Sequence, residues 1–316
     1  MRHVEVSSFG GPEVLVIKES ADPTAGPGEV VIDVAVAGVQ SLDTYLRRGQ
    51  WPDFLPHPPP YPPGLEAAGT VAAIGDGVDS SWLGRRVVAT PAAGGYADRV
   101  SAPVGTIAAV PDTLALDQAM ALLNDGSTAA GLLERTPVEP GERVLVQPAA
   151  GGLGTVLVQL LVNAGAQVVG AARGEAKLAL IRDLGAEPVD YSEPDWLDRV
   201  GAVDVVFDGV SGELGRAAFT AVRDGGRYSN YGNASAAEDA VTAEEAAARG
   251  VRHVGMDQLP EFHPERPRRV AEVLRQAAEG RIRPVIGATY PLHRVADAHR
   301  AIEAREAVGK VLLTPK

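Results

Sequence analysis

The sequence predicts an α/β protein in which a partly open β-barrel domain is joined to a doubly wound parallel sheet. Two observations predict this fold class. Short apolar runs bounded by glycine and proline fill the first third of the chain, and from about residue 114 such runs alternate with segments of helical periodicity. Many short strands are typical of a barrel, whereas alternating strands and helices are typical of a parallel sheet. The length of 316 residues suits two domains of ordinary size.

We expect the first domain to span residues 1–120 and to be completed by residues 285–316. Its expected strands lie at residues 4–6, 15–17, 30–36, 64–71 and 85–89, and a turn followed by a further strand is expected within residues 94–100. Residues 42–48 predict a short helix that Gly49 ends. Residues 52–63 hold seven prolines, too many for a helix or a central strand, and therefore predict an ordered loop or flap.

We expect the second domain to occupy residues 121–284. Its strands are expected at residues 144–147, 167–172, 187–189, 204–208 and 226–230, with helices between them that end near residues 161, 184, 199 and 222. Further helices are expected at residues 116–123, 127–133, 234–250, 263–279 and 295–304, with a turn at 124–127. A last strand at 310–313 is expected to return to the first domain.

A glycine-rich turn between the first strand and the first long helix of this second domain predicts a dinucleotide site. Ala149, Gly151 and Gly154 have the spacing of the Rossmann fingerprint G-x-G-x-x-G, with alanine at the first position. A pyrophosphate can approach the N–H groups of a helix N-terminus only where side chains are small or absent. We therefore expect cofactor contacts from Ala150, Gly151, Gly152, Leu153 and Gly154. The alternative is a glycine-rich turn with a purely structural role.

The residues about twenty positions further on indicate which nicotinamide cofactor is used. NAD enzymes place an acid at the end of the second strand, where it binds the ribose hydroxyls. Here that strand is followed by Arg173, Lys177 lies one helical turn later, and no acid ends the strand. Two cations suit a 2′-phosphate and favour NADPH. The alternative is that both are ordinary solvated charges at the start of a helix.

Composition excludes several other classes of protein. A net charge of −12 argues against a general nucleic-acid surface, and the absence of cysteine excludes disulfides, thiol nucleophiles and cysteine-based zinc sites. The N-terminal residues lack the apolar core of a signal peptide. Residues 144–172 carry no charge and are long enough to span a membrane, but their glycines, proline and amides favour a buried strand–helix–strand unit. We expect a soluble, cytoplasmic protein with no membrane partner.

The order and spacing of several motifs resemble the medium-chain dehydrogenase/reductase superfamily, and within it the zinc-free quinone oxidoreductases. The motifs lie at residues 43–49, 64–69, 95–97, 147–154, 184–186, 204–208 and 309–313, so the resemblance covers essentially the whole chain. It implies a GroES-like barrel domain followed by a Rossmann domain. Zinc-dependent members have cysteine at the position of Gln40 and histidine at the position of Leu65, so this chain cannot build their catalytic zinc site. Zinc-free relatives commonly have asparagine where this chain has Gln40.

The resemblance also implies roles for single residues. Gln40 and Tyr45 match the polar positions nearest the acceptor oxygen. The further cofactor positions are Thr128, Tyr191, Gly232, Asn233 and Lys310. Tyr191 could instead be a half-buried tyrosine at a strand end, and Thr128 a hydroxyl at a helix N-terminus. Asp208 is interpreted as a structural cap, and His57, His263, His293 and His299 as surface residues without ligand spacing.

These observations predict an NADPH-dependent oxidoreductase that transfers hydride to a quinone or an activated C=C bond without zinc. One alternative is an enoyl reductase of a biosynthetic pathway, with residues 52–63 shaping a pocket for a larger substrate. Another is a non-catalytic NADPH-binding protein. The resemblance implies a homodimer joined through its Rossmann sheets, and residues 253–256 are the candidate edge.

Overall fold

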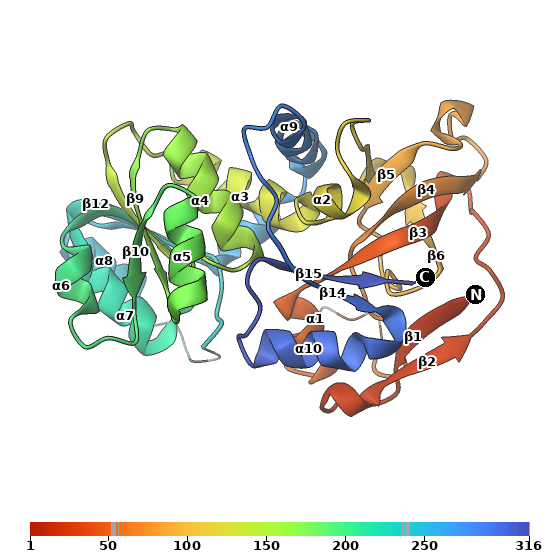
Figure 1. Ribbon diagram of the computed structural model, residues 1–316, viewed down its shortest axis with the longest axis horizontal. Coiled ribbons are helices and arrows are strands. Elements are labelled where there is room, and N and C mark those ends of the chain that lie inside the picture. The colour runs from red at the N-terminus through yellow and green to blue at the C-terminus, as the bar shows by residue number, and fades with distance from the viewer. Residues whose placement is uncertain (52–54, 56, 236, 238–240, 316) are drawn as a thin grey trace. The chain divides into compact units, whose positions relative to one another are not determined.

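The computed structural model describes residues 1–51, 55, 57–235, 237 and 241–315. The chain divides into two compact units. The first unit contains residues 1–124, 270–280 and 284–316, and the second contains residues 125–269 and 281–283. Figure 1 labels the helices and strands along the chain from red to blue.

The second unit is built on a six-stranded sheet in which every pairing is parallel. The strand order is β10-β9-β8-β11-β12-β13. The strands are β8 (Arg143–Gln147), β9 (Gln167–Ala172), β10 (Glu187–Asp190), β11 (Val203–Asp208), β12 (Val222–Asn230) and β13 (Arg252–Val254). This confirms the predicted doubly wound sheet, and the uncharged stretch 144–172 resolves into β8, a helix and β9.

Helices cover both faces of this sheet (Figure 1). The connecting helices are α4 (Gly152–Asn163), α5 (Glu175–Asp183), α6 (Trp196–Val200), α7 (Gly212–Ala221) and α8 (Ala243–Ala248). Val169 and Ala171 belong to a core cluster that includes Trp196 and Phe219. Gly170 faces the opposite side, since a Cβ built there would lie 2.6 Å from Ile181 of α5. Burial on both faces explains why β11 is apolar along most of its length.

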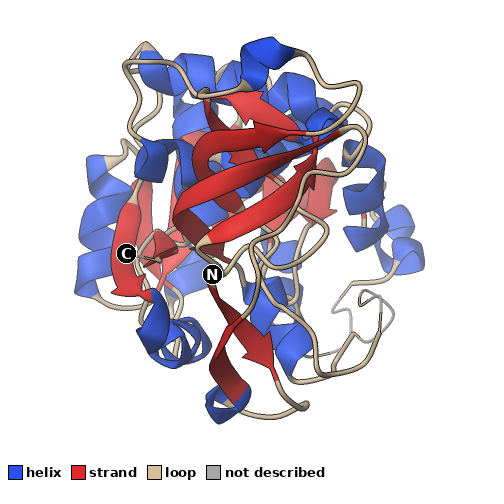
Figure 2. Cartoon of the chain, turned by 90° about the vertical axis from the view of Figure 1, so that its right-hand side faces the viewer, coloured by secondary structure: helices blue, strands red, loops and turns tan. Residues whose placement is uncertain are grey.

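The first unit contains a seven-stranded, mostly antiparallel sheet, and Figure 2 shows its twisted strands in red. Its order is β14-β15-β3-β4-β5-β7, with β6 paired to β3. The strands are β3 (Glu29–Val39), β4 (Ala67–Ile74), β5 (Arg86–Ala89), β6 (Arg99–Pro103), β7 (Ile107–Ala109), β14 (Ile286–Pro291) and β15 (Lys310–Thr314). A separate hairpin joins β1 (Arg2–Val6) to β2 (Leu15–Glu19). The C-terminal strand β15 pairs antiparallel with β3.

The remaining helices lie in the first unit, except α3 and α9, which have residues in both units. They are α1 (Ser41–Arg47), α2 (Leu116–Met120), α3 (Leu123–Arg135), α9 (Arg266–Ala278) and α10 (Val295–Glu303). Short 3₁₀ segments include η5 (Met256–Phe262).

Two expected elements differ in the structure. The turn expected at residues 124–127 is part of α3, because Asp125 and Ser127 are buried and tertiary packing outweighs the low helix propensity of this stretch. Within the expected helix at residues 234–250, the described residues form a helix only in α8, where Thr242 caps the first turn by accepting the Glu245 N–H. In the proline-rich segment, residues 52–54 and 56 lie outside the described residues.

Candidate cofactor and active site

The turn from β8 into α4 has the shape expected of an anion cradle. A Cβ on Gly154 would lie 2.1 Å from the carbonyl oxygen of Pro148, so only glycine lets the helix pack this close to the preceding chain. A Cβ on Gly151 would have no atom within 4 Å, so the space above the helix N-terminus is open. The first turn of α4 contains no acid. Unpaired N–H groups beside open space fit a pyrophosphate.

The fully buried carboxylate of Asp208 organises the carboxyl ends of the central strands. It accepts hydrogen bonds from Gln147 Nε2 at 2.9 Å, from the Val210 N–H at 2.8 Å and from the Tyr228 hydroxyl at 2.6 Å. These donors belong to β8, to the loop after β11 and to β12. Asp208 is therefore a structural cap, as interpreted from the sequence.

The loop after β12 packs closely against the loop after β11. A Cβ on Gly232 would lie 3.0 Å from the Gly209 carbonyl oxygen, and the Ser211 hydroxyl donates to the Gly232 carbonyl at 3.0 Å. Asn233 donates from its side-chain amide to the Ala237 carbonyl. Gly151, Gly154 and Gly232 therefore share the carboxyl edge of the sheet, where doubly wound folds bind their ligands.

Thr128 does not lie at a helix N-terminus. Since α3 begins at Leu123, this half-buried residue falls in the second turn, which removes the alternative interpretation of its hydroxyl as a helix-start group. Asp125 of α3 lies near Tyr231 in the loop after β12. Burial raises the pKa of Tyr231, and the neighbouring charges of Asp208 and Asp125 raise it further.

The predicted 2′-phosphate residues lie at the ends of β9 and β10. Arg173 directly follows β9 and is exposed, whereas Lys177, in the first turn of α5, is half-buried. Tyr191 directly follows β10, is half-buried, and donates its N–H to the Ala172 carbonyl at 3.2 Å. Asp190, the last residue of β10, also lies at this edge of the sheet, because it pairs with Ala172, the last residue of β9.

Asp190 is a residue that the sequence interpretation missed. That interpretation found no acid at the end of the second strand, but the acid comes from the next strand in the sheet, 17 positions after Arg173. Its Oδ2 accepts the Gly174 N–H at 3.1 Å, and its Oδ1 accepts the Ser192 hydroxyl at 2.6 Å. Burial opposes ionisation, but these hydrogen bonds and the charge of Arg173 outweigh it and lower the pKa of Asp190.

Gln40 and Tyr45 lie on α1 of the first unit. Gln40 is the half-buried N-cap residue, and its N–H donates to Asp43 Oδ2 at 2.8 Å. The ring of Tyr45 meets that of Trp51 edge to face, with 4.9 Å between centroids. Burial raises the pKa of Tyr45, so its phenol stays protonated at neutral pH and can donate a hydrogen bond.

Asp43 of α1 belongs to a group of buried polar side chains in the first unit. Tyr96 donates its hydroxyl to Asp43 Oδ2 at 2.9 Å, and Lys310 Nζ donates to Glu66 Oε2 at 2.7 Å. We call Asp43, Glu66, Tyr96 and Lys310 the buried polar cluster. All four are at most 3% exposed. Burial raises the pKa of Asp43 to about 6, although the bonds from Gln40 and Tyr96 oppose this shift.

The structure adds to or corrects the sequence interpretation of four residues. Lys310, expected to contact the cofactor, lies in the first unit, where its ammonium group binds Glu66. Asp43 and Glu66 belong to recognisable motifs, but nothing in their spacing indicates that they are buried. The interpretation of His299 as a surface residue is wrong. It is fully buried beside Arg47, and burial lowers its pKa to about 3.

The donor set of the first unit does not fit a catalytic zinc. Gln40 and Leu65 occupy the positions of the expected cysteine and histidine, and an amide with an aliphatic side chain cannot replace those ligands. Within the described residues, no group of three His, Cys, Asp or Glu side chains could hold a metal ion.

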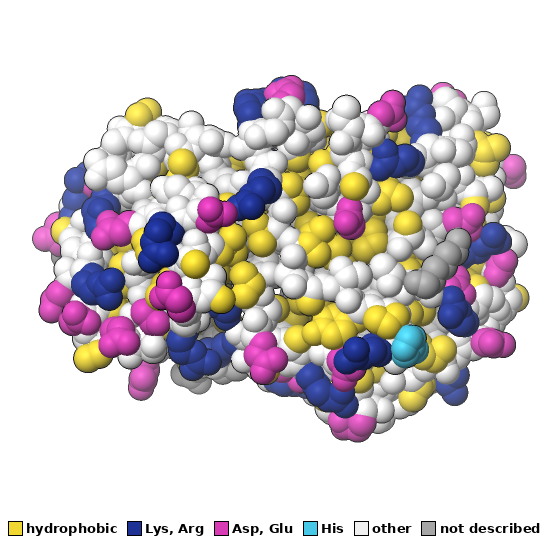
Figure 3. All heavy atoms as spheres, viewed as in Figure 1, with side chains coloured by type: hydrophobic (Ala, Val, Ile, Leu, Met, Phe, Trp, Pro, Cys, Tyr) yellow, Lys and Arg dark blue, Asp and Glu magenta, His cyan; other side chains and the backbone are white. Residues whose placement is uncertain are grey.

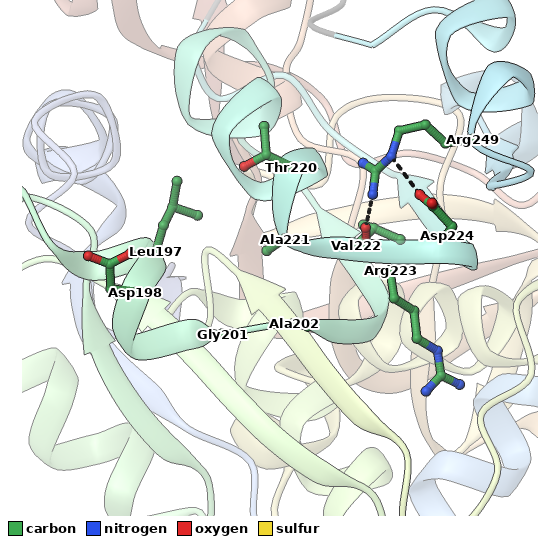
Figure 4. Close-up of a pocket in the computed structure, with 10 residues that line it drawn as sticks. All are labelled: Leu197, Asp198, Gly201, Ala202, Thr220, Ala221, Val222, Arg223, Asp224 and Arg249. Atoms are coloured by element: carbon green, nitrogen blue, oxygen red, sulfur yellow. Dashed lines mark hydrogen bonds and ion pairs between the residues drawn. The ribbon is translucent and has the colours of Figure 1, made fainter.

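Figure 4 shows the residues that line a hollow of about 540 Å³ in the second unit. Its lining includes Gly201, Ala202 and Val222, which lie at the amino ends of β11 and β12, the edge opposite the cradle. Arg249 there donates to the Val222 carbonyl and pairs with Asp224 at 3.0 Å. We therefore assign the cofactor cradle to the carboxyl edge and not to this hollow.

Comparisons with known proteins cover the whole chain. The family described as "Alcohol dehydrogenase GroES-like domain" matches residues 26–112, and the family described as "Zinc-binding dehydrogenase" matches residues 184–313. A probable quinone oxidoreductase of Schizosaccharomyces pombe is 33% identical, with 98% of this chain and 96% of the relative covered. A 2-haloacrylate reductase of a Burkholderia species is 32% identical, with 97% of each covered. The structure of Escherichia coli quinone oxidoreductase complexed with NADPH matches with a TM-score of 0.92 at 27% identity, covering all of both chains.

Proposed function

This chain belongs to the quinone oxidoreductase family of the medium-chain dehydrogenase/reductase superfamily, and we propose from that premise that it is an NADPH-dependent reductase of quinones or activated C=C bonds. The observation that carries the proposal is the cradle at Gly151 and Gly154, in a chain similar over its full length to proteins with this activity.

We propose that NADPH is held along the carboxyl edge of the second unit. The N–H groups at the start of α4, over residues 150–154, take the pyrophosphate, because helix N-termini attract anions and this one carries no acid. Arg173, Lys177 and Tyr191 take the 2′-phosphate. Thr128, Gly232 and Asn233 are assigned to the nicotinamide. Lys310 is also assigned to the cofactor, as the resemblance implies, and its ammonium group is paired with Glu66.

When bound, the reduced nicotinamide supplies a hydride to the acceptor. The protein orients the acceptor and stabilises the negative charge that develops on its oxygen. The Gln40 amide and the protonated Tyr45 phenol are the proposed hydrogen-bond donors to that oxygen. Water supplies the proton to the product, so neither side chain needs to be a general acid.

The test is the rate of NADPH oxidation with three kinds of acceptor: quinones, α,β-unsaturated ketones and enoyl thioesters. We expect turnover with quinones or unsaturated ketones and a lower kcat/KM with thioesters. A preference for thioesters would instead favour an enoyl reductase of biosynthesis. Tight NADPH binding without turnover on any acceptor would favour a non-catalytic binding protein and contradict the proposal.

One comparison favours the activated C=C bond as a second candidate substrate. The Burkholderia relative is named for the reduction of 2-haloacrylate, in which a C=C bond is conjugated to a carboxylate. A carboxylate or carbonyl oxygen beside that bond would use the same two donors, Gln40 and Tyr45. Comparing 2-haloacrylate with a simple quinone under equal conditions separates the two substrate classes.

We also propose a small-molecule substrate, a homodimer and a cytoplasmic location. Figure 3 shows acidic and basic side chains interspersed over the face drawn, and the net charge is −12, which is unfavourable for binding nucleic acid. No helix in the described part of the chain is long and apolar enough to cross a membrane. The terminal strand β13 lies at an edge of the parallel sheet and could pair with a second copy. A monomer in light scattering would contradict the dimer, and cell fractionation tests the location.

A further inference from the structure

The end of β10 places a carboxylate beside the residues that would read the 2′-phosphate. Asp190 is the last residue of β10, next to Tyr191 in the chain and opposite Ala172 in the sheet. Ala172 in turn precedes Arg173. Asp190 thus adjoins Tyr191 in the chain and lies across the sheet from the residue before Arg173, so it is close to two of the proposed phosphate ligands.

The structure keeps this carboxylate ionised and fixed in place. Ser192 donates both its N–H, at 2.9 Å, and its hydroxyl, at 2.6 Å, to Asp190 Oδ1. The Gly174 N–H donates to Oδ2 at 3.1 Å. Gly174 has a φ of +92°, so this bond also holds the turn between β9 and α5 in a conformation that favours glycine.

A phosphate bound beside Arg173 would also lie near Asp190, whose charge has the opposite sign. The Arg173 guanidinium forms no ion pair within the described residues, yet its charge reaches Asp190 and favours the ionised carboxylate. A 2′-phosphate would be attracted by the guanidinium and repelled by the carboxylate. NADH lacks that phosphate and would feel neither effect strongly.

We propose that Asp190 is a specificity-determining residue that reduces the preference for NADPH over NADH set by Arg173 and Lys177. This inference rests on the proposed use of NADPH and adds to it a residue that limits discrimination between the two cofactors. The protein would then keep measurable activity with NADH.

The direct test is calorimetric binding of adenosine 2′,5′-bisphosphate and of 5′-AMP at low ionic strength, since the two probes differ only in the 2′-phosphate. We expect Asp190→Asn to bind the bisphosphate about three- to tenfold more tightly, the size expected when one charge near a phosphate is removed in a largely aqueous site. Affinity for 5′-AMP should stay within about twofold. Added salt should shrink the gain.

Two control variants separate charge from structure. Glu187→Gln removes the same charge from the opposite end of β10, about 10 Å away, and should raise the affinity for the bisphosphate clearly less than Asp190→Asn does, because a more distant charge acts more weakly. Ser192→Ala removes a hydrogen bond from the same loop without altering its charge, and should leave the ratio of the two affinities unchanged.

Three results would overturn the proposal. Equal changes for both probes in Asp190→Asn would mean that the residue only supports the Gly174 turn. Weaker bisphosphate binding would mean that it assists the phosphate site. An equal gain in Glu187→Gln would assign the effect to net charge. If the unaltered protein bound neither probe, the cofactor assignment itself would fail. If the unaltered protein preferred the bisphosphate but Asp190→Asn left the ratio of the two affinities unchanged, only this inference would be contradicted.

Discussion

The cofactor cradle and the buried polar cluster are built in opposite ways. The cradle works because side chains are missing at Gly151 and Gly154, so that backbone N–H groups can meet a ligand. The cluster works because ionisable side chains of the first unit are buried and satisfy one another. The cradle is thus expected to be sensitive to added atoms, and the cluster to lost or altered charges.

The cluster should show the largest response to a single substitution. Lys310→Met leaves the fully buried Glu66 carboxylate without its ammonium partner, and breaking a buried ion pair in this way costs about 3–5 kcal/mol. We expect a loss of this size in the free energy of unfolding, measured by urea denaturation.

The double variant Glu66→Gln with Lys310→Met is the control. It removes both charges, and a glutamine oxygen can still accept the Asn124 N–H, which lies 3.1 Å from Glu66 Oε1. Most of the loss should therefore be recovered, to within about 2 kcal/mol of the unaltered protein. A double variant less stable than Lys310→Met would show that the charge pair is not what the cluster depends on.

The cluster should also make stability depend on pH. Burial raises the pKa of Asp43 from 3.8 to about 6, so folding favours its protonated form. The stability contributed by this group is fully present below pH 3.8 and is lost as pH rises through about 6. Relative to Asp43→Asn, the unaltered protein should lose about 1–3 kcal/mol across this window. Parallel stability curves for the two proteins would contradict the shifted pKa.

Alanine at the two glycines of the cradle should have different effects on stability and on NADPH binding. Gly154→Ala places a methyl group against the Pro148 carbonyl and should cost about 1–3 kcal/mol of stability. Gly151→Ala has space and an ordinary φ of −84°, so its thermal unfolding should be unchanged while NADPH binding weakens about tenfold. Fluorescence titration and calorimetric unfolding together test this. Unchanged NADPH affinity in Gly151→Ala would show that the open space is not a ligand site.

A further prediction concerns an exposed charge in the second unit. Arg173→Ala should weaken NADPH binding by about tenfold and leave NADH nearly unchanged, since a charge-assisted hydrogen bond in an exposed site contributes about 1.5 kcal/mol before salt screening. The comparison of kcat/KM for the two cofactors measures it. Equal loss with both cofactors would mean that Arg173 shapes the turn after β9.

The cradle was predictable from sequence because its determinants are local. Strand, glycine-rich turn and helix are contiguous over residues 143–163, and each part has its own residue signal. The alternation of strands and helices around it predicted the parallel sheet for the same reason.

The cluster and Asp190 were not predictable in this way because their partners are distant in sequence. Asp43 meets Tyr96 53 positions later, and Glu66 meets Lys310 244 positions later. Asp190 reaches the turn after β9 through strand pairing. The helical turn at residues 124–127 was missed because its burial, rather than its composition, decides its conformation.

The central claim is that this chain transfers hydride from NADPH without a metal. It is tested most directly by NADPH oxidation with a quinone after exhaustive chelation, together with elemental analysis of the same sample. Since Gln40 and Leu65 replace two zinc ligands, we predict unchanged kcat/KM and no stoichiometric zinc. Activity that disappears on chelation and returns with one zinc per chain would contradict the claim.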